Sequence, residues 1–327
     1  MTAPESPMLP RSHSLVFNGD WGGANFHRIC SWLSQEFCDR AGPASRVSIR
    51  NWCDGGASGV KEVNDGYADL CIFTPAMLAG DAIKGRGIFS ERPLPHLRAL
   101  AVIPQDDRIA LAINKKFGVS TFEELRTKKP ALKIATSVDD GTNPIGYIAG
   151  RYLEAHGLSQ EIFEAWGGSF VTRTRPEESL FLMQDGEVDA VLQEAMMAPW
   201  WQDVMADENN IMLPAEESAL ETLSKEHGWR RNDLPKGYFS SLKADTPALD
   251  FSDFVIVVRD DMPARIAHLL TWCLVETKSL IENQYRHIPA DRSPVSYPFD
   301  PVKMARTPIP LHSGARRYYR DAGYLQA

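Results

Sequence analysis

The segment DGYADLCIF, residues 65–73, has a counterpart in DGEVDAVLQ, residues 185–193. Both read Asp-Gly-x-x-Asp followed by an apolar run, and they begin 120 residues apart (185 − 65). In each copy a helix is expected to end, a glycine to turn the chain, and a buried strand to begin. This spacing is close to the size of one α/β domain, so the repeat predicts two similar lobes. The alternative is that both copies are ordinary helix-to-strand turns, which often have this composition.

Around the two copies, short apolar runs alternate with amphipathic helical patterns. Strands are predicted at 15–17, 47–52, 68–74, 97–103, 109–114, 133–136, 188–193 and 254–258. Helices are predicted at 58–65, 143–155, 176–184 and 263–281, and over a segment with Phe26, Ile29, Cys30, Leu33 and Phe37 on one face. The alternation is typical of an α/β fold with mostly parallel sheets flanked by helices. The polar segment 228–250, which contains Pro and Gly, is expected to be a surface excursion.

The order of the strands predicts how the chain divides. The apolar runs at 97–103 and 109–114 are expected to carry the chain from the first lobe to the second, and the run at 254–258 to return it. The first lobe is therefore predicted to comprise residues 1–105 plus 256–327, and the second residues 106–255. A ligand cleft is expected between them.

Charge and composition exclude several classes of function. The net charge is −8 and no basic stripe is present, which argues against nucleic acid as a partner. No apolar run approaches the roughly 20 residues that span a bilayer, so direct membrane insertion is not expected. The first 14 residues have no basic segment followed by an apolar core, and five scattered cysteines favour free thiols. The sequence as written predicts a cytoplasmic protein, or a periplasmic one if a leader has been removed.

Two stretches contain candidate binding residues. The stretch TSVDDGTNPIGYIAG, residues 136–150, begins like a phosphate-binding loop, but no Lys follows and Asp139 and Asp140 would repel phosphate. Asn143 followed by Pro144 is a helix-start signal, and a helix start presents backbone N–H groups to an anion. Glu194 follows a predicted strand directly, where ligands bind in α/β sheets. No Cys or His spacing matches a zinc site, and we expect no catalytic residue, metal or cofactor.

Several further stretches together resemble one protein family. They are NGDWGGANFHRI, CDGGASGVKEVNDGYADLCIF, PLPHLRALAVI, VDDGTNPIGYIAGRYLEAHGL, DGEVDAVLQEAMMAPW and LHSGARRYYRDAGY. In this order they are similar to the TAXI-class solute receptors, the substrate-binding proteins of TRAP transporters. The resemblance implies a two-lobe, type II periplasmic-binding-protein clamshell. It also implies binding of a small organic acid or amino-acid-like carboxylate by lobe closure, and delivery to TRAP membrane subunits without catalysis.

By the same resemblance, the ligand contacts lie in turns that follow successive strands. They are Gly23, Ala24, Asn25, Gly56, Ala57, Ser58 and Thr74 in the first lobe, and Gly141, Thr142, Asn143 and Glu194 in the second. We predict that backbone N–H groups and the Thr142 hydroxyl bind a carboxylate. The side chains of Asp139 and Asp140 are expected to point away, and either to cap neighbouring amides or to meet the other lobe on closure. Glu194 is expected to face the cleft and favour a ligand with an amine or hydroxyl, unless it caps a helix.

Two other functions fit the same fold class. One is a cytoplasmic enzyme, for example a decarboxylase-like one acting on an aromatic or other small carboxylic acid, with Asp140 and Glu194 as acids in the cleft. The other is a cytoplasmic metabolite sensor, which would bind its ligand by the same physics. The leading interpretation remains a binding protein rather than an enzyme.

Overall fold

The computed structural model describes residues 6–20, 25–290 and 292–325. The chain forms two compact units, the first comprising Met1–Asp106 and Ser252–Ala327 and the second comprising Asp107–Phe251. Two chain segments therefore connect the units. Two predicted ligand contacts, Gly23 and Ala24, lie outside the described residues.

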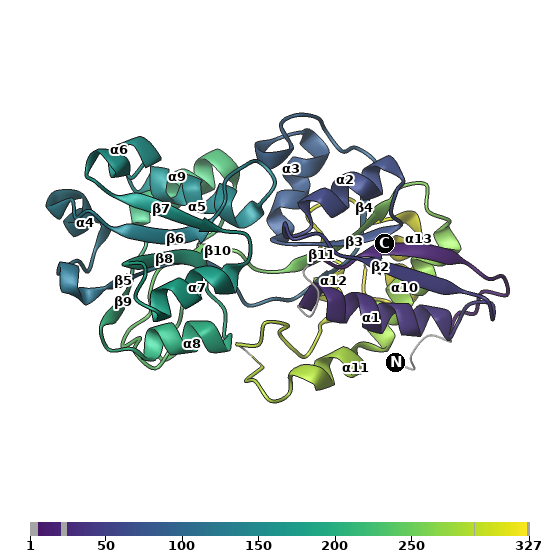
Figure 1. Cartoon of the computed structure of the whole chain (residues 1–327). Helices are drawn as coiled ribbons and strands as arrows, with labels where there is room; N and C mark the ends of the chain where they lie inside the picture. Colours follow the sequence, from purple (N-terminus) through teal and green to yellow (C-terminus); the bar gives the residue numbers. More distant parts are fainter. Residues whose placement is uncertain (1–5, 21–24, 291, 326–327) are drawn as a thin grey trace. The chain divides into compact units, whose positions relative to one another are not determined.

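The first unit is a sheet covered by helices. Its strands are β1 (Ser14–Asn18), β2 (Arg46–Arg50), β3 (Leu70–Phe73), β4 (Leu97–Ile103) and β11 (Phe254–Arg259). Its helices are α1 (Asn25–Cys38), α2 (Ala57–Asp65), α3 (Ala79–Lys84), α10 (Ala264–Glu276), α11 (Lys278–Glu282), α12 (Pro301–Met304) and α13 (Ser313–Asp321). Figure 1 shows α2 and α3 on one face of this sheet and α1 and α10 on the other.

This first sheet has the order β2-β1-β3-β11-β4 and is mixed. β1 pairs in parallel with β2 and β3, whereas β11 is antiparallel to both β3 and β4. β11 is the strand on which the chain returns from the second unit. Because it pairs with strands of the first unit, residues 252–255 belong there, although the sequence pattern grouped them with the second lobe.

The second unit has the same plan. Its strands are β5 (Arg108–Asn114), β6 (Lys133–Ser137), β7 (Ser169–Arg173), β8 (Ala190–Glu194), β9 (Asn210–Leu213) and β10 (Leu249–Asp250). Its helices are α4 (Phe122–Lys128), α5 (Pro144–Ala155), α6 (Gln160–Ala165), α7 (Pro176–Gln184), α8 (Pro199–Ala206) and α9 (Glu217–His227). β6 is parallel to β7 and β8, and β5 runs antiparallel to β8, β9 and β10. Each unit thus combines a parallel block with one reversed strand.

The repeated Asp-Gly-x-x-Asp segments have the same structural role in both units. Gly66 ends α2 with φ 80° and Gly186 follows α7 with φ 71°, backbone conformations that glycine adopts without strain. The second aspartate of each copy then bonds the neighbouring parallel strand. The Asp69 carboxylate accepts a hydrogen bond from the Val16 N–H at 2.8 Å, and Asp189 accepts one from the Lys133 N–H at 3.0 Å. The repeat is therefore a strand-alignment device that occurs once per sheet.

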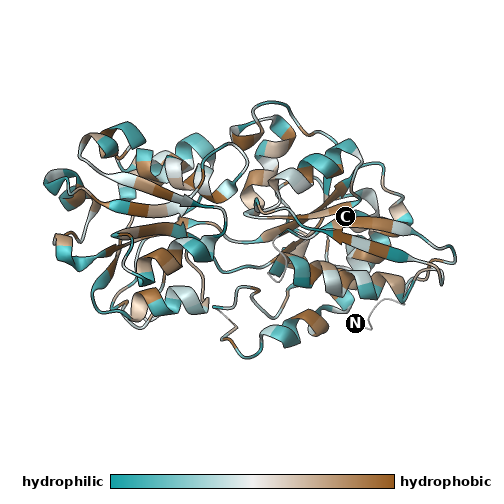
Figure 2. Cartoon of the chain, in the orientation of Figure 1, coloured by the Kyte–Doolittle hydropathy of each residue, from teal (hydrophilic) through white to brown (hydrophobic). Residues whose placement is uncertain are grey.

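Most predicted elements are present, with one break. The buried face of α1 contains Phe26, Ile29, Cys30, Leu33 and Phe37, as the periodicity predicted. The single helix expected at 263–281 is instead two helices, α10 and α11, which are separated at the buried Thr277. Hydrophobic residues concentrate on the strands and on the inward faces of the helices (Figure 2).

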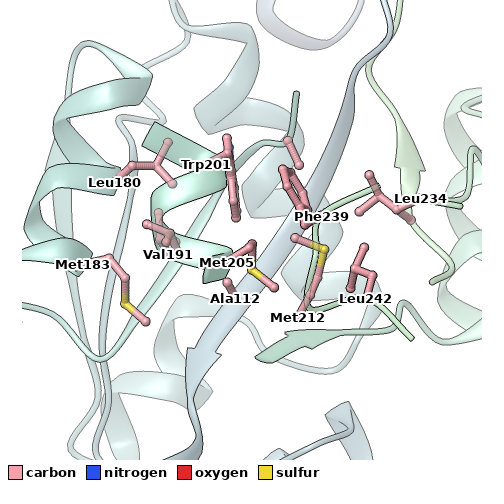
Figure 3. Close-up of a cluster of buried hydrophobic side chains, with 14 of the residues drawn as sticks. Ala112, Leu180, Met183, Val191, Trp201, Met205, Met212, Leu234, Phe239 and Leu242 are labelled. Atoms are coloured by element: carbon pink, nitrogen blue, oxygen red, sulfur yellow. The ribbon is translucent and has the colours of Figure 1, made fainter. Parts of the chain in front are cut away.

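The segment 228–250 is not the surface excursion that its composition suggested. Leu234, Phe239 and Leu242 from this segment are buried in the core of the second unit (Figure 3). Phe239 stacks on Trp201 of α8 with ring centroids 5.9 Å apart, and Trp201 is fully buried. Polar and Pro/Gly residues set the path of the segment, but its scattered apolar side chains decide where it packs.

Candidate functional site

In the first unit, β1, β2 and β3 are parallel, so the turns that follow them lie at one edge of the sheet. The turn after β2 contains Asp54, a buried residue whose carboxylate accepts hydrogen bonds from the Gly56 N–H at 3.1 Å and the Ser58 N–H at 2.9 Å. Burial raises the pKa of this carboxyl group. Gly56, Ala57 and Ser58, which were expected to contact a ligand, therefore lie at a helix start that Asp54 already caps.

A second buried carboxyl group lies beside Asp54. Asp20 follows β1, is 1% exposed, and accepts a hydrogen bond from the Asp54 N–H at 3.3 Å. Gly56 approaches the sheet so closely that a Cβ there would lie 2.4 Å from the Ile72 carbonyl oxygen, and its φ is 91°. A glycine is required at this position by the packing itself. This edge of the first unit is consequently acidic and tightly packed.

Thr74 follows β3 and is also buried. Its hydroxyl oxygen lies 3.1 Å from Gln105 Oε1 and 3.2 Å from the Asp253 carbonyl oxygen, so it can donate its proton to either. The Thr74 hydroxyl therefore ties the end of β3 to both segments that lead out of this unit. Asn25, at the start of α1, accepts a hydrogen bond from the Tyr285 hydroxyl at 2.5 Å.

In the second unit, β6 and β8 end side by side. The parallel register pairs Ile134 with Ala190, which brings Ser137 next to Gln193. Both side chains are buried, and Gln193 Nε2 donates hydrogen bonds to Ser137 Oγ at 2.9 Å and to Ser179 Oγ at 3.0 Å. This network fixes the two strand ends, after which β6 leads into the turn 138–143 and β8 ends at Glu194.

Hydrogen bonds within the turn 138–143 and the start of α5 use several of the turn's polar groups. The Asn143 side chain caps α5 by accepting hydrogen bonds from Ile145 N–H at 2.9 Å and Gly146 N–H at 3.3 Å. The exposed Asp140 carboxylate accepts from both the N–H and the hydroxyl of Thr142, at 3.0 and 2.6 Å, and these bonds lower its pKa. Gly141 has φ 79° and its Cβ position is open space. The donors expected to hold a ligand carboxylate are therefore bonded to Asp140.

Glu194 lies in a buried carboxyl pair that the sequence did not reveal. Its side chain shares a hydrogen bond with that of Asp107, the residue that precedes β5, and the two residues are 8% and 0% exposed. A hydrogen bond between two carboxyl groups requires one of them to be protonated. Burial, together with the neighbouring carboxylate, raises the pKa of Asp107 well above its usual range, and burial raises that of Glu194 to about 7.

The pairing of strands explains why Asp107 was missed. β5 and β8 are antiparallel with Ile109 opposite Glu194, so the residue just before β5 lies beside the residue that ends β8. These two positions are 87 residues apart in the chain (194 − 107), and only the sheet brings them together. The role of Asp54 could have been found earlier, since an Asp in a Gly-rich turn commonly accepts a hydrogen bond from the backbone N–H two residues on, here that of Gly56.

The acids do not form a metal site. Within the described ranges, no cluster of three or more His, Cys, Asp or Glu residues could hold a metal ion. All five cysteines are free thiols, as the sequence indicated. No helix among the described residues is long and apolar enough to cross a membrane.

Solved structures share this fold at low sequence identity. A protein from Bordetella bronchiseptica RB50 is 13% identical, with a TM-score of 0.54, over 94% of this chain and 97% of that one. A structure described as a periplasmic transporter is 13% identical, with a TM-score of 0.52, over 95% and 94%. A TctC solute-binding protein from Polaromonas is 11% identical, with a TM-score of 0.50, over 99% and 97%. No curated protein matches the sequence.

These likenesses confirm the predicted fold class, a two-lobe α/β fold of the periplasmic-binding-protein type. The sheets were predicted to be mostly parallel but are mixed, because β11 and β5 run antiparallel to their neighbours. The sequence itself matches the model of one family, described as the NMT1-like family, over residues 41–323. That match covers both units and most of the chain. The protein therefore belongs to the NMT1-like family.

Proposed function

We propose that this protein is a periplasmic solute-binding protein of the TAXI type, which binds a small amino-acid-like carboxylate and delivers it to TRAP membrane subunits. Family membership and a fold shared with a TctC solute-binding protein and a periplasmic transporter support the receptor function. The ordered sequence stretches that resemble TAXI receptors support the class.

The observation that carries the choice of ligand is the buried Asp107–Glu194 pair at the end of β8. An ammonium group that reaches this pair displaces one of its protons, and the carboxylate left behind neutralises the ammonium in a site of low dielectric. A ligand with only an acid group would instead meet like charge there. Glu194 is thus the amine-binding residue, with Asp107 as its partner.

The acid group of the ligand is assigned to the turn 140–143. The start of the 12-residue helix α5 carries a partial positive charge, and a neutral amide, Asn143, caps it. A ligand carboxylate accepts the hydrogen bonds that the N–H and the hydroxyl of Thr142 otherwise donate to Asp140. The exposed side chain of Asp140 then rotates into solvent. Gly141 leaves open space for this approach.

Matched ligand pairs test the proposal directly. Thermal denaturation is measured with L-glutamate against glutarate and with L-phenylalanine against 3-phenylpropionate, and similarly for other amino acids. For the correct side chain, the amine-bearing member should stabilise the protein by about 2.7 kcal/mol at a hundredfold excess over its Kd, and its partner should not. Equal stabilisation by both members would contradict the role of Glu194, and conversion of the ligand to product would contradict the receptor function.

Calorimetric titration with the same ligand in two buffers of different ionisation enthalpy measures the number of protons released on binding. At pH 6 we expect release of about one proton per ligand bound, because the ammonium displaces the Glu194 proton from the pair. In the Glu194→Gln variant this release should disappear together with most of the affinity. Unchanged proton release in that variant would show that another group is responsible.

Thr142→Val tests the carboxylate contact. Loss of a hydrogen bond to a charged group should weaken binding about tenfold or more, while stability changes little because Thr142 is exposed. Thr172→Val, an equally isosteric change at an exposed position of β7, is the matched control and should leave the affinity unaltered. Gly141 is left intact, because a side chain at φ 79° would strain the turn. Wild-type affinity in Thr142→Val would place the carboxylate elsewhere.

A further inference from the structure

The C-terminal helix α13 carries three arginines on one exposed face. Arg316, Arg317 and Arg320 line a hollow of about 580 Å³ in the first unit, together with Arg98 of β4 and the acids Asp260 and Asp321. The concentration of guanidinium groups is unusual for a chain with a net charge of −8. The proposed ligand site does not use any of these residues.

This hollow lies at the opposite edge of the sheet from the turns described above. β3 begins at Leu70 and ends just before Thr74. β11 pairs with β3 on one side and with β4 on the other, so that Val258 lies between Leu70 and Arg98. Arg98 and Asp260 are therefore at the edge where β3 begins. The length of the strand separates the hollow from Thr74, so a ligand here would be distinct from one held at the turns.

The arginine face is held rigidly from behind. The opposite side of α13 packs on α10 so tightly that a Cβ at Gly314 would lie 2.2 Å from the Ala264 carbonyl oxygen. The buried Tyr318 hydroxyl donates a hydrogen bond to Glu276 of α10. At the other wall, the Arg98 guanidinium donates to the carbonyl oxygens of Pro95 and Leu97, at 2.9 and 2.7 Å. The packing of α13 on α10 and the hydrogen bonds of Arg98 therefore restrict the positions of the guanidinium groups.

Only half of the arginine charge is balanced locally. Arg98 pairs with Asp260 at 3.5 Å and Arg317 with Asp321 at 3.4 Å. Arg316 and Arg320, which are four residues apart on the same face, have no ion-pair partner in the part of the chain that the structure describes. Two exposed guanidinium groups on one helix face repel each other, and an anion between them removes that repulsion.

We infer that this hollow is a second binding site, for a small, multiply charged oxyanion that carries phosphate or several carboxylate groups. Its volume is within the range of about 300–1,000 Å³ that small-molecule sites occupy, whereas a protein partner would need a surface of about 800 Å². A lining of arginines without lysine favours phosphate and carboxylate groups, because each guanidinium can bond two oxygens of one such group.

Calorimetry with pyrophosphate and citrate, at low ionic strength and without divalent metal, tests this site, and acetate is the singly charged comparison. The wild-type protein should bind both polyanions and not acetate. Arg316→Gln/Arg320→Gln should weaken binding about tenfold or more, and Arg316→Lys/Arg320→Lys should fall between, since charge remains but the two-pronged bonds do not. Unfolding midpoints of the variants report that the exposed substitutions leave the fold intact.

The matched control is Arg46→Gln/Arg286→Gln, which removes the same charge from two exposed positions of the first unit. It should retain wild-type affinity for both polyanions. Equal weakening in the two Gln variants would show general attraction to a less acidic surface and would overturn the site. Absence of polyanion binding by the wild-type protein would overturn it as well.

Discussion

The double variant Asp107→Asn/Glu194→Gln is expected to lose most of the decrease in stability that the wild-type protein undergoes between about pH 4.5 and pH 7. Both carboxyl groups have raised pKa values in the folded protein, so the folded state binds more protons than the unfolded chain over this range. Stability contributed by the pair is therefore complete below about pH 4.5 and falls as the pH rises through about 7. The amides cannot titrate, and the variant retains the buried hydrogen bond.

The size of this effect follows from the shift of Glu194 from 4.5 to about 7, which corresponds to about 3 kcal/mol in the free energy of unfolding. The measurement is the difference in unfolding free energy between wild type and variant, by urea denaturation across the pH range. Taking the difference removes the contributions of titrating groups outside the pair. Arg108 lowers the pKa of Asp107, and because this effect disappears with the carboxyl group it is part of the difference. Asp185→Asn/Glu187→Gln, at exposed positions of the same unit, should leave the wild-type pH dependence in place. A difference that does not vary with pH would show that the pair is ionised throughout.

Gly146→Ala is expected to destabilise the protein by about 2 kcal/mol or more, although alanine is the better helix former. A Cβ at Gly146 would lie 1.9 Å from the Val138 carbonyl oxygen and 2.8 Å from the Asp139 nitrogen, so backbone would have to move. The displaced segment is the start of the turn 138–143, and we therefore expect ligand affinity to fall as well. Chemical denaturation and ligand titration measure the two effects.

Gly150→Ala is the matched control, because it lies one turn later in the same helix. Its nearest neighbour is Asp139 Oδ2 at 3.0 Å, the end of a half-exposed side chain that can rotate away. This substitution should be neutral or stabilise by up to about 1 kcal/mol, through helix propensity. Similar stability of the two variants would show that α5 and the turn after β6 are less closely packed than the structure has them.

Local sequence signals predicted the elements that depend on neighbours in the chain. Asn143 followed by Pro144 indicated the start of α5, and the side chain of Asn143 does cap that helix. The apolar face of α1 was likewise legible, since its spacing is fixed by helical geometry. The candidate ligand residues remain predictions. The structure adds that Asp54 and Asp140 occupy several of the donors these residues offer.

Segments whose placement depends on distant partners were predicted less well. The polar composition of 228–250 indicated a surface loop, but Leu234, Phe239 and Leu242 fill the core of the second unit. Few apolar residues are needed for this, because burial of each large side chain contributes about 1.5–3 kcal/mol. Hydropathy averaged over a stretch of sequence does not reveal isolated buried side chains of this kind.

The sequence by itself determined the two-unit α/β organisation, because its repeat and its alternation of strands and helices are local patterns with fixed periods. The tertiary structure alone decided which carboxyl groups become partners. Asp107 and Glu194 meet only because β5 and β8 are antiparallel neighbours, and Asp20 meets Asp54 because β1 lies beside β2. The raised pKa values of Asp54, Asp107 and Glu194 follow from burial at those sheet edges, a property of the packed fold that no pattern of neighbouring residues specifies.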